Sequence, residues 1–181
     1  LRSSSAASDV YKRQALDLMT NDEEGRPWNL ADKECQERAL KLQEETKPWM
    51  LIASPPCTMF STLQNISIAK RDANEVEVKL EDAMMHLSFA ALMCIRQAKQ
   101  GRKFMLEHPV GASSWSTAVL NKLYFLDGSE RVNFDFCMGG MKSSKGEENE
   151  MVKKRTGVMT NCPGVVKYLR SLQCDGEHPH T

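Results

Sequence analysis

The chain has 181 residues, 41% of them apolar, and its 24 lysines and arginines balance its 24 aspartates and glutamates. This length and apolar content predict one globular, soluble domain. The zero net charge excludes a global positive field that would draw the molecule to nucleic acid. No stretch approaches the roughly 18 apolar residues of a membrane span, and there is no secretory signal pattern. Six cysteines without a compact framework favour a reduced, intracellular protein.

The chain starts with a segment that looks foreign to the fold. Residues 1–14 lack an initiator methionine and resemble translated adapter sequence, so we exclude them from the fold argument. We expect a core at 15–161, already inside a domain at its start, and a tail at 162–181. The segment 15–18 is predicted to be a strand remnant that ends near Asp17; the alternative is an ordinary turn aspartate.

Apolar spacing predicts alternating helices and strands. Such alternation is typical of an α/β fold with a mostly parallel sheet and flanking helices. We expect helices at 31–46, 75–100 and 114–126, and strands at 49–53, 103–106, 131–138 and 158–160. The long segment 61–74 has no clear period, which indicates a functional or disordered loop.

A cysteine follows the first core strand. Pro55 and Pro56 end that strand and stiffen the turn that presents Cys57, because proline fixes φ and cannot donate to a ladder. Open α/β sheets bind ligands outside the carboxyl ends of their strands. The position therefore suggests a nucleophile; the alternative is a small buried apolar side chain.

An acidic residue follows the next strand. If the two strands are parallel, Glu107 shares an edge with Cys57 and could hold a proton for a substrate. The alternative is a strand-end glutamate in water. Another alternative is a thiol enzyme that pairs Cys57 with His108, which needs the imidazole within hydrogen-bond reach of the sulfur.

Together these segments resemble the DNA cytosine-5 methyltransferase family. Ser54–Ser61 matches its Pro-Pro-Cys-Gln-x-Phe-Ser segment, with Thr58 in place of glutamine. Glu107–Pro109 matches its Glu-Asn-Val or Glu-Asn-Pro segment, with His108 in place of asparagine. Arg155–Asn161 looks like the Lys-Pro-Thr-x-x-x-Thr-Asn segment of phage-type and retroelement-associated members.

The resemblance implies a Rossmann-like catalytic core that transfers a methyl group from S-adenosylmethionine to carbon 5 of cytosine in DNA. Cys57 would add to carbon 6, and Glu107 would protonate ring nitrogen 3 of a flipped base. The family's glycine-rich Phe-x-Gly-x-Gly turn is not found, which favours a fragment truncated at its N-terminus. We expect a monomer, nuclear if the host is eukaryotic.

The resemblance also suggests binding residues around these two side chains. Asp17 and Pro55 would contact the cofactor. The substrate-binding candidates are Pro56, Ser61, Arg155, Thr156 and Asn161. The basic segments 70–71 and 153–155 could meet phosphates. The alternative function is an inactive methyltransferase-like domain of a retroelement polyprotein that binds nucleic acid or protein.

The tail carries residues of the kinds that zinc takes as ligands. Cys162, Cys174, His178 and His180 offer two sulfurs and two imidazoles, and are predicted as a structural metal site. The alternative is a frayed terminus that happens to contain histidines.

Overall fold

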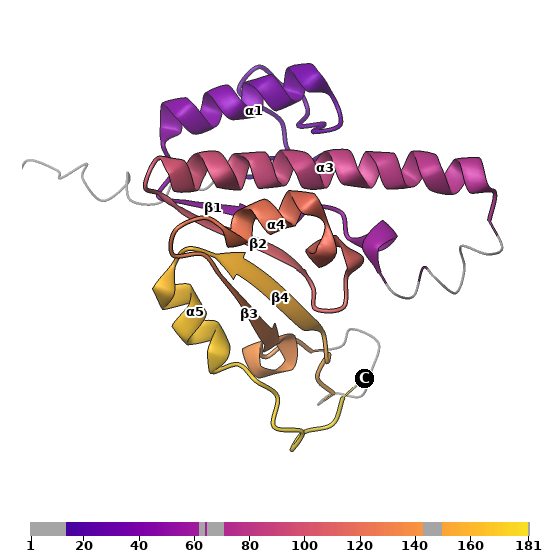
Figure 1. The fold of residues 1–181 in the computed structure, drawn as a ribbon, viewed down its shortest axis with the longest axis vertical. Helices are drawn as coiled ribbons and strands as arrows, with labels where there is room; N and C mark the ends of the chain where they lie inside the picture. The colour runs from indigo at the N-terminus through magenta and orange to yellow at the C-terminus, as the bar shows by residue number, and fades with distance from the viewer. Residues whose placement is uncertain (1–13, 62–63, 65–70, 143–149, 181) are drawn as a thin grey trace, which may run out of the picture. The chain divides into compact units, whose positions relative to one another are not determined.

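The computed structural model describes residues 14–61, 64, 71–142 and 150–180, and the chain divides into two compact units, 1–45 and 46–181 (Figure 1). In the first unit, an irregular segment folds onto helix α1 (Lys33–Thr46), which the sequence predicted. Asp22 accepts hydrogen bonds from Arg26 and Arg38. The Arg38 guanidinium also lies 4.9 Å from the centre of the buried Trp28 ring. These polar and cation–π contacts fasten the segment to the helix.

The second unit is built on a four-stranded sheet. Its strands are β1 (Met50–Ala53), β2 (Lys103–Pro109), β3 (Glu130–Asp135) and β4 (Arg155–Thr160), in the order β1-β2-β4-β3. Strand β1 is parallel to β2, whereas β4 is antiparallel to both of its neighbours. The predicted α/β class is confirmed, but the prediction of a mostly parallel sheet is wrong. A helix separates β1 from β2, as a parallel pair requires, whereas β3 and β4 are consecutive strands.

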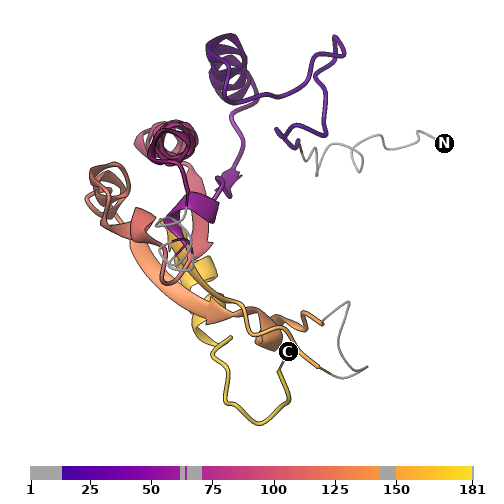
Figure 2. The same ribbon diagram turned by 90° about the vertical axis from the view of Figure 1, so that its right-hand side faces the viewer.

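Helices cover both faces of this sheet. Helices α3 (Ala73–Lys99) and α4 (Ala118–Tyr124) pack on one face, and α5 (Pro163–Arg170) packs on the other (Figure 2). The buried side chains of the first layer include Leu87, Phe104, Leu106, Leu120, Leu123 and Met159. Those of the second are Val132, Phe134, Val158, Val166 and Leu169. The two central strands, β2 and β4, supply both cores through alternate residues, whereas β1 contributes to the first and β3 to the second.

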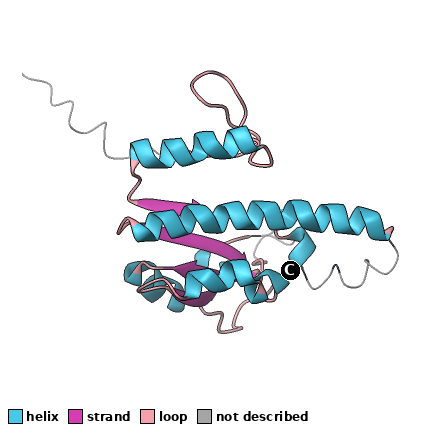
Figure 3. Cartoon of the chain, turned by 45° about the horizontal axis from the view of Figure 1, so that its top comes forward, coloured by secondary structure: helices cyan, strands magenta, loops and turns pink. Residues whose placement is uncertain are grey.

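The long helix α3 runs along the strands that it covers (Figure 3). Asp72 caps its start by accepting a hydrogen bond from the Glu75 amide at 3.1 Å, and Gly101, at φ +73°, follows its end. Leu80 belongs to the predicted apolar face but is 41% exposed, because the first turns of the helix extend past the core. None of the described helices is long and apolar enough to cross a membrane.

Three other predicted elements change their limits. The helix expected at 114–126 is broken at Thr117, whose hydroxyl caps α4 by accepting from the Leu120 amide at 3.3 Å. The strand expected at 131–138 ends at Asp135, where a 3₁₀ turn (Phe136–Gly139) begins. The last strand is longer than the predicted 158–160, because it begins at Arg155.

Candidate functional site: a strand-end turn and a cysteine–histidine cluster

The turn after β1 and the end of β2 lie at one edge of the sheet. Ala53 of β1 pairs in parallel with Leu106 of β2, so Ser54 and Glu107 come next at the same edge of the sheet. The predicted strand stopped before Glu107, whereas β2 continues to Pro109. Glu107 is half-buried within the strand. Because side chains alternate along a strand, it lies on the face opposite His108.

His108 connects the two motifs. Its side chain is 1% exposed, with Nδ1 2.7 Å from the Ser114 hydroxyl and Nε2 3.0 Å from the Pro55 carbonyl oxygen. A carbonyl oxygen can only accept, so Nε2 carries the proton and donates to Pro55, and Nδ1 accepts from Ser114. Burial lowers the pKa of His108, although the Pro55 hydrogen bond and the Glu107 charge oppose this. The buried ring is therefore neutral and holds the turn.

Contacts of the backbone and of Phe60 also hold the turn that carries Cys57. Cys57 is half-buried, and its carbonyl accepts a hydrogen bond from the Phe60 amide at 3.0 Å. The Phe60 ring is buried, with its centre 5.7 Å from the His108 ring. Both ring nitrogens of His108 are engaged, by Ser114 and Pro55, so neither is free to activate Cys57. This arrangement argues against the thiol enzyme that pairs the two.

A tryptophan packs against the histidine, and an arginine stacks on the tryptophan. The Trp115 indole donates to the Pro109 carbonyl at 2.8 Å, and its ring meets the His108 ring edge-on at 6.2 Å. The Arg131 guanidinium lies 4.2 Å from the centre of the Trp115 ring. A Cβ atom at Gly157 would come within 3.1 Å of both Trp115 and Arg131. The glycine of β4 therefore provides the space for this stack.

The other predicted substrate-binding residues fall at two opposite edges. Thr156 pairs with Pro109 at the Glu107 edge and is fully buried, and the neighbouring Arg155 is exposed. Asn161 lies at the other edge, where its side chain accepts from the Phe104 amide at 2.9 Å and helps to start β2. Pro56 is exposed and Ser61 half-buried on the turn itself.

The predicted cofactor residues belong to different units of the chain. Asp17 is exposed in the first unit, and its carboxylate accepts from the Met19 amide at 2.8 Å. The predicted strand remnant at 15–18 is wrong, because the segment is a turn that this aspartate closes. The Pro55 carbonyl is already engaged by His108. These two residues therefore give no evidence of an S-adenosylmethionine site.

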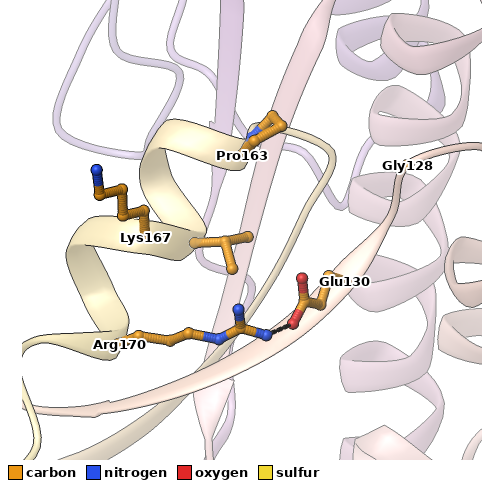
Figure 4. A pocket seen from close by; sticks show the side chains of 6 residues that line it. Gly128, Glu130, Pro163, Lys167 and Arg170 are labelled. Atoms are coloured by element: carbon orange, nitrogen blue, oxygen red, sulfur yellow. Dashed lines mark hydrogen bonds and ion pairs between the residues drawn. The ribbon is translucent and has the colours of Figure 1, made fainter.

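Two shallow cavities lie on the second unit. One, of about 400 Å³, adjoins the Cys57 turn, and its lining includes Pro56, Thr58, Arg71 and Lys79. The other, of about 380 Å³, lies between the start of β3 and α5, where Arg170 pairs with Glu130 (Figure 4). This second cavity is at the Asn161 edge, away from Cys57. Lys70 and most of the predicted loop 61–74 lie outside the described residues.

Four possible metal ligands converge where the tail meets the end of β3. The ligand atoms of Cys137, Cys174, His178 and His180 all lie within 4.8 Å of one another. Cys137 is the residue that the sequence interpretation missed. It takes the place predicted for Cys162, which is buried at the start of α5 instead. The strand ends before Cys137, and the following 3₁₀ turn brings the sulfur to the tail.

The contacts within the cluster have the spacing of ligands around one ion. The Cys174 sulfur lies 3.4 Å from His180 Nε2 and 3.9 Å from His178 Nε2. On its other side, His178 Nδ1 is 3.6 Å from the Asp175 carboxylate. Burial and the adjacent Cys174 thiol raise the pKa of Cys137. Desolvation and the nearby His178 lower the pKa of His180. The four ligand atoms are close enough together to hold one metal ion, which binds thiolate and neutral imidazole.

Comparison with known proteins adds no family to these observations. No protein-family model, curated protein sequence or solved structure matches the chain.

Proposed function

We propose that the second unit is a DNA cytosine-5 methyltransferase-like core, in which Cys57 activates cytosine by covalent addition. The observation that carries this proposal is the His108 hydrogen bond to the Pro55 carbonyl at 3.0 Å. This bond ties the cysteine turn to His108, the residue next to Glu107. The His108 ring is buried and neutral, so the turn is held in place before any substrate binds. A fixed turn of this kind suits a nucleophile that must meet a base in one geometry.

The addition step gives the two side chains complementary roles. Glu107 lies on the face of β2 opposite the His108 ring that holds the turn, so the base must meet both side chains at the end of the strand. The Cys57 thiolate forms a bond to carbon 6, and the electron pair of the 5,6 double bond moves into the ring. Glu107, as the acid, gives a proton to ring nitrogen 3, which leaves carbon 5 nucleophilic. Carbon 5 then accepts an electrophile, its hydrogen leaves as a proton, and elimination returns the thiolate while the proton on ring nitrogen 3 goes back to Glu107. The base must leave the stack before any of this can occur.

Exposed basic residues support DNA as the substrate. Lys153, Lys154 and Arg155 lead into β4, whose first residues pair with the end of β2 beside Glu107. They are exposed, and this edge of the sheet is the one that carries the cysteine turn. Phosphate contacts from lysine and arginine need no excess charge over the whole molecule, only a local concentration.

The methyl donor implied by the resemblance is S-adenosylmethionine. Because Asp17 and Pro55 are engaged in local hydrogen bonds, we assign no donor-binding residue in the described chain. The proposal therefore concerns the activation of carbon 5, which proceeds without the donor.

Hydrogen exchange at carbon 5 tests this activation directly. The chain is incubated with DNA that carries 5-tritiated cytosine, and tritium released to water is counted; addition and protonation suffice, and no methyl donor is needed. We expect release above background that is abolished in Cys57→Ser. In Glu107→Gln it should fall by about 100-fold or more, because proton transfer contributes about 10²–10⁴ to such rates.

Cys162→Ser is the matched control, since it makes the same change at the opposite edge of the sheet, where serine is also a good helix cap. It should release tritium at the parental rate. Release by the parental chain no faster than by Cys57→Ser contradicts the proposal. Binding to DNA together with such a result favours the alternative of an inactive interaction module.

We also propose that the cluster of Cys137, Cys174, His178 and His180 binds zinc. Two thiolates and two imidazoles are a ligand set of structural zinc sites, and zinc prefers this mixture to the oxygen ligands of calcium or magnesium. Zinc bonds of about 2.0–2.3 Å in a tetrahedron place ligand atoms about 3.3–3.8 Å apart. The two distances from the Cys174 sulfur, 3.4 and 3.9 Å, lie close to this range.

Metal content tests the zinc assignment. The chain purified under reducing conditions should contain one zinc per molecule by mass spectrometry of the metal. Cys137→Ser and Cys174→Ser should lose it, and Cys162→Ser should keep it. A chain that takes up no zinc, or a Cys162→Ser variant that loses it equally, contradicts the assignment.

A further inference from the structure

The tail between α5 and the C-terminus is ordered with little apolar burial. From Gln173 to His180 every side chain is exposed or half-buried, and no regular helix or strand forms. Ordering such a segment costs conformational entropy at each residue. Hydrophobic burial normally offsets that cost, and here it is nearly missing. Another interaction must hold the tail in place.

The hydrogen bonds of the tail show where it is attached. The Asp135 amide donates to the Leu172 carbonyl at 2.9 Å, and the Asp135 carboxylate accepts from the Cys174 amide at 3.0 Å. Further on, the Met151 amide donates to the Pro179 carbonyl at 3.1 Å. The tail therefore touches the end of β3 and the segment that leads to β4. Single hydrogen bonds that replace bonds to water contribute little net stability.

The cluster sits between these two attachments. Cys137 belongs to the turn after β3, whereas the other three ligands belong to the tail, and His180 forms a bridge with Met151. One ion bound by all four would join segments far apart in the chain. Closing so long a loop is where a metal stabilises most.

We infer that zinc in this cluster is a structural clasp, which fastens the tail to the end of β3, and that Asp175 is a positioning residue for the ligand His178. This inference rests on the zinc binding proposed above. All four positions are filled by protein ligands, as in structural rather than catalytic zinc sites. The Asp175 carboxylate, 3.6 Å from His178 Nδ1, can fix the ring so that Nε2 faces the metal.

Hydrogen exchange read by mass spectrometry tests the clasp on the full chain. Removing zinc with a chelator should speed the exchange of amides at 172–180 and 150–152 by about tenfold or more, as for local opening, and leave α3 and β2 unchanged. Returning zinc should restore protection. Cys137→Ser should show the fast exchange with or without zinc, and Cys162→Ser should behave like the parental chain.

The possible failures are distinguishable. Zinc that binds without changing tail exchange overturns the clasp but leaves the zinc assignment standing. A chain that binds no zinc overturns both. Loss of protection throughout β2 and α3 on chelation also overturns the clasp, because it would make the metal a requirement for the whole unit.

Asp175 is tested separately by zinc affinity. Asp175→Asn should weaken zinc binding by about 10- to 100-fold, the usual effect of losing the carboxylate behind a ligating histidine. Asp175→Glu should restore most of the affinity. Asp127→Asn, an exposed turn aspartate away from the cluster, is the control and should bind zinc normally. Unchanged affinity in Asp175→Asn overturns the positioning role.

Discussion

The turn held by His108 and the cysteine–histidine cluster differ in how complete they are. Both ring nitrogens of His108 have partners supplied by the chain, and the ring is buried among Phe60 and Trp115. In the cluster, the Cys174 sulfur contacts both histidines, and all three side chains are possible metal ligands. The first arrangement is stabilised by folding alone. The second brings together four groups that can bind one cation.

Removing the His108 ring should lower the stability of the protein more than any other change proposed for this turn. His108→Ala leaves a gap in the core, the Pro55 carbonyl without its donor and the Ser114 hydroxyl without its acceptor. We expect the free energy of unfolding to fall by about 2–4 kcal/mol. Urea denaturation at pH 7.5 measures it. His86→Ala removes a half-buried histidine of α3 that lies 3.8 Å from Asp82, and should cost about 1 kcal/mol or less. Equally small losses of stability in both variants would contradict the role of His108 in holding the turn.

Filling the space at Gly157 should have a smaller effect. In Gly157→Ala the new methyl group meets Trp115 and Arg131 at 3.1 Å. We expect a loss of about 1–3 kcal/mol from overpacking, seen as a lower melting temperature. Gly164→Ala is the control, because no atom lies within 4 Å of its new Cβ and the site is in α5. It should be neutral or stabilising, since alanine favours helix. Similar losses at both positions would contradict the role of the stack.

The pH dependence of stability should give the smallest effect, but it reports specifically on the protonation of His108. Burial lowers the pKa of His108 in the folded state. Below about pH 6.5, the unfolded chain therefore takes up a proton that the folded ring refuses. His108 should thus weaken stability as the pH falls, by at most about 1.4 kcal/mol per pH unit, and have no such effect above pH 7.

Urea denaturation between pH 7.5 and 5.5, with a chelator present, measures this slope. His108→Gln should show a shallower fall in stability than the parental chain, while the histidines of the tail contribute equally to both. Identical slopes would mean that the ring takes up its proton equally in the folded and unfolded states, which contradicts its burial in a neutral form.

Local patterns predicted much of the second unit. The apolar spacing predicted α3 and the position of β1, and proline correctly marked the end of β1 before Cys57. Strand direction was not predictable in this way, since β4 reads like any other apolar strand. Whether it runs parallel or antiparallel depends on long-range pairing with β2 and β3.

The candidate sites show the same limit. Three of the four cluster residues lie close together in the tail, so their spacing revealed them. Cys137 comes from a different part of the chain, and the sequence interpretation chose Cys162 instead, which is the first residue of the predicted tail. The signal that could have found it is the Asp135–Gly140 segment, where a strand stops before two glycines. The sequence marked His108 as a departure from a motif and as a possible partner of Cys57. Its burial and the hydrogen bonds of both ring nitrogens cannot be read from neighbours in sequence.

The position of β4 has a consequence for how the chain acquires its fold. This strand is the last of those that the structure describes, yet it lies between β2 and β3 and is the sheet neighbour through which β3 joins the others. During synthesis, β2 and β3 leave the ribosome first and keep unpaired edges until Arg155–Thr160 follows. Exposed edges of this kind invite association with other nascent chains. A truncation before Arg155 would leave that hazard in place permanently.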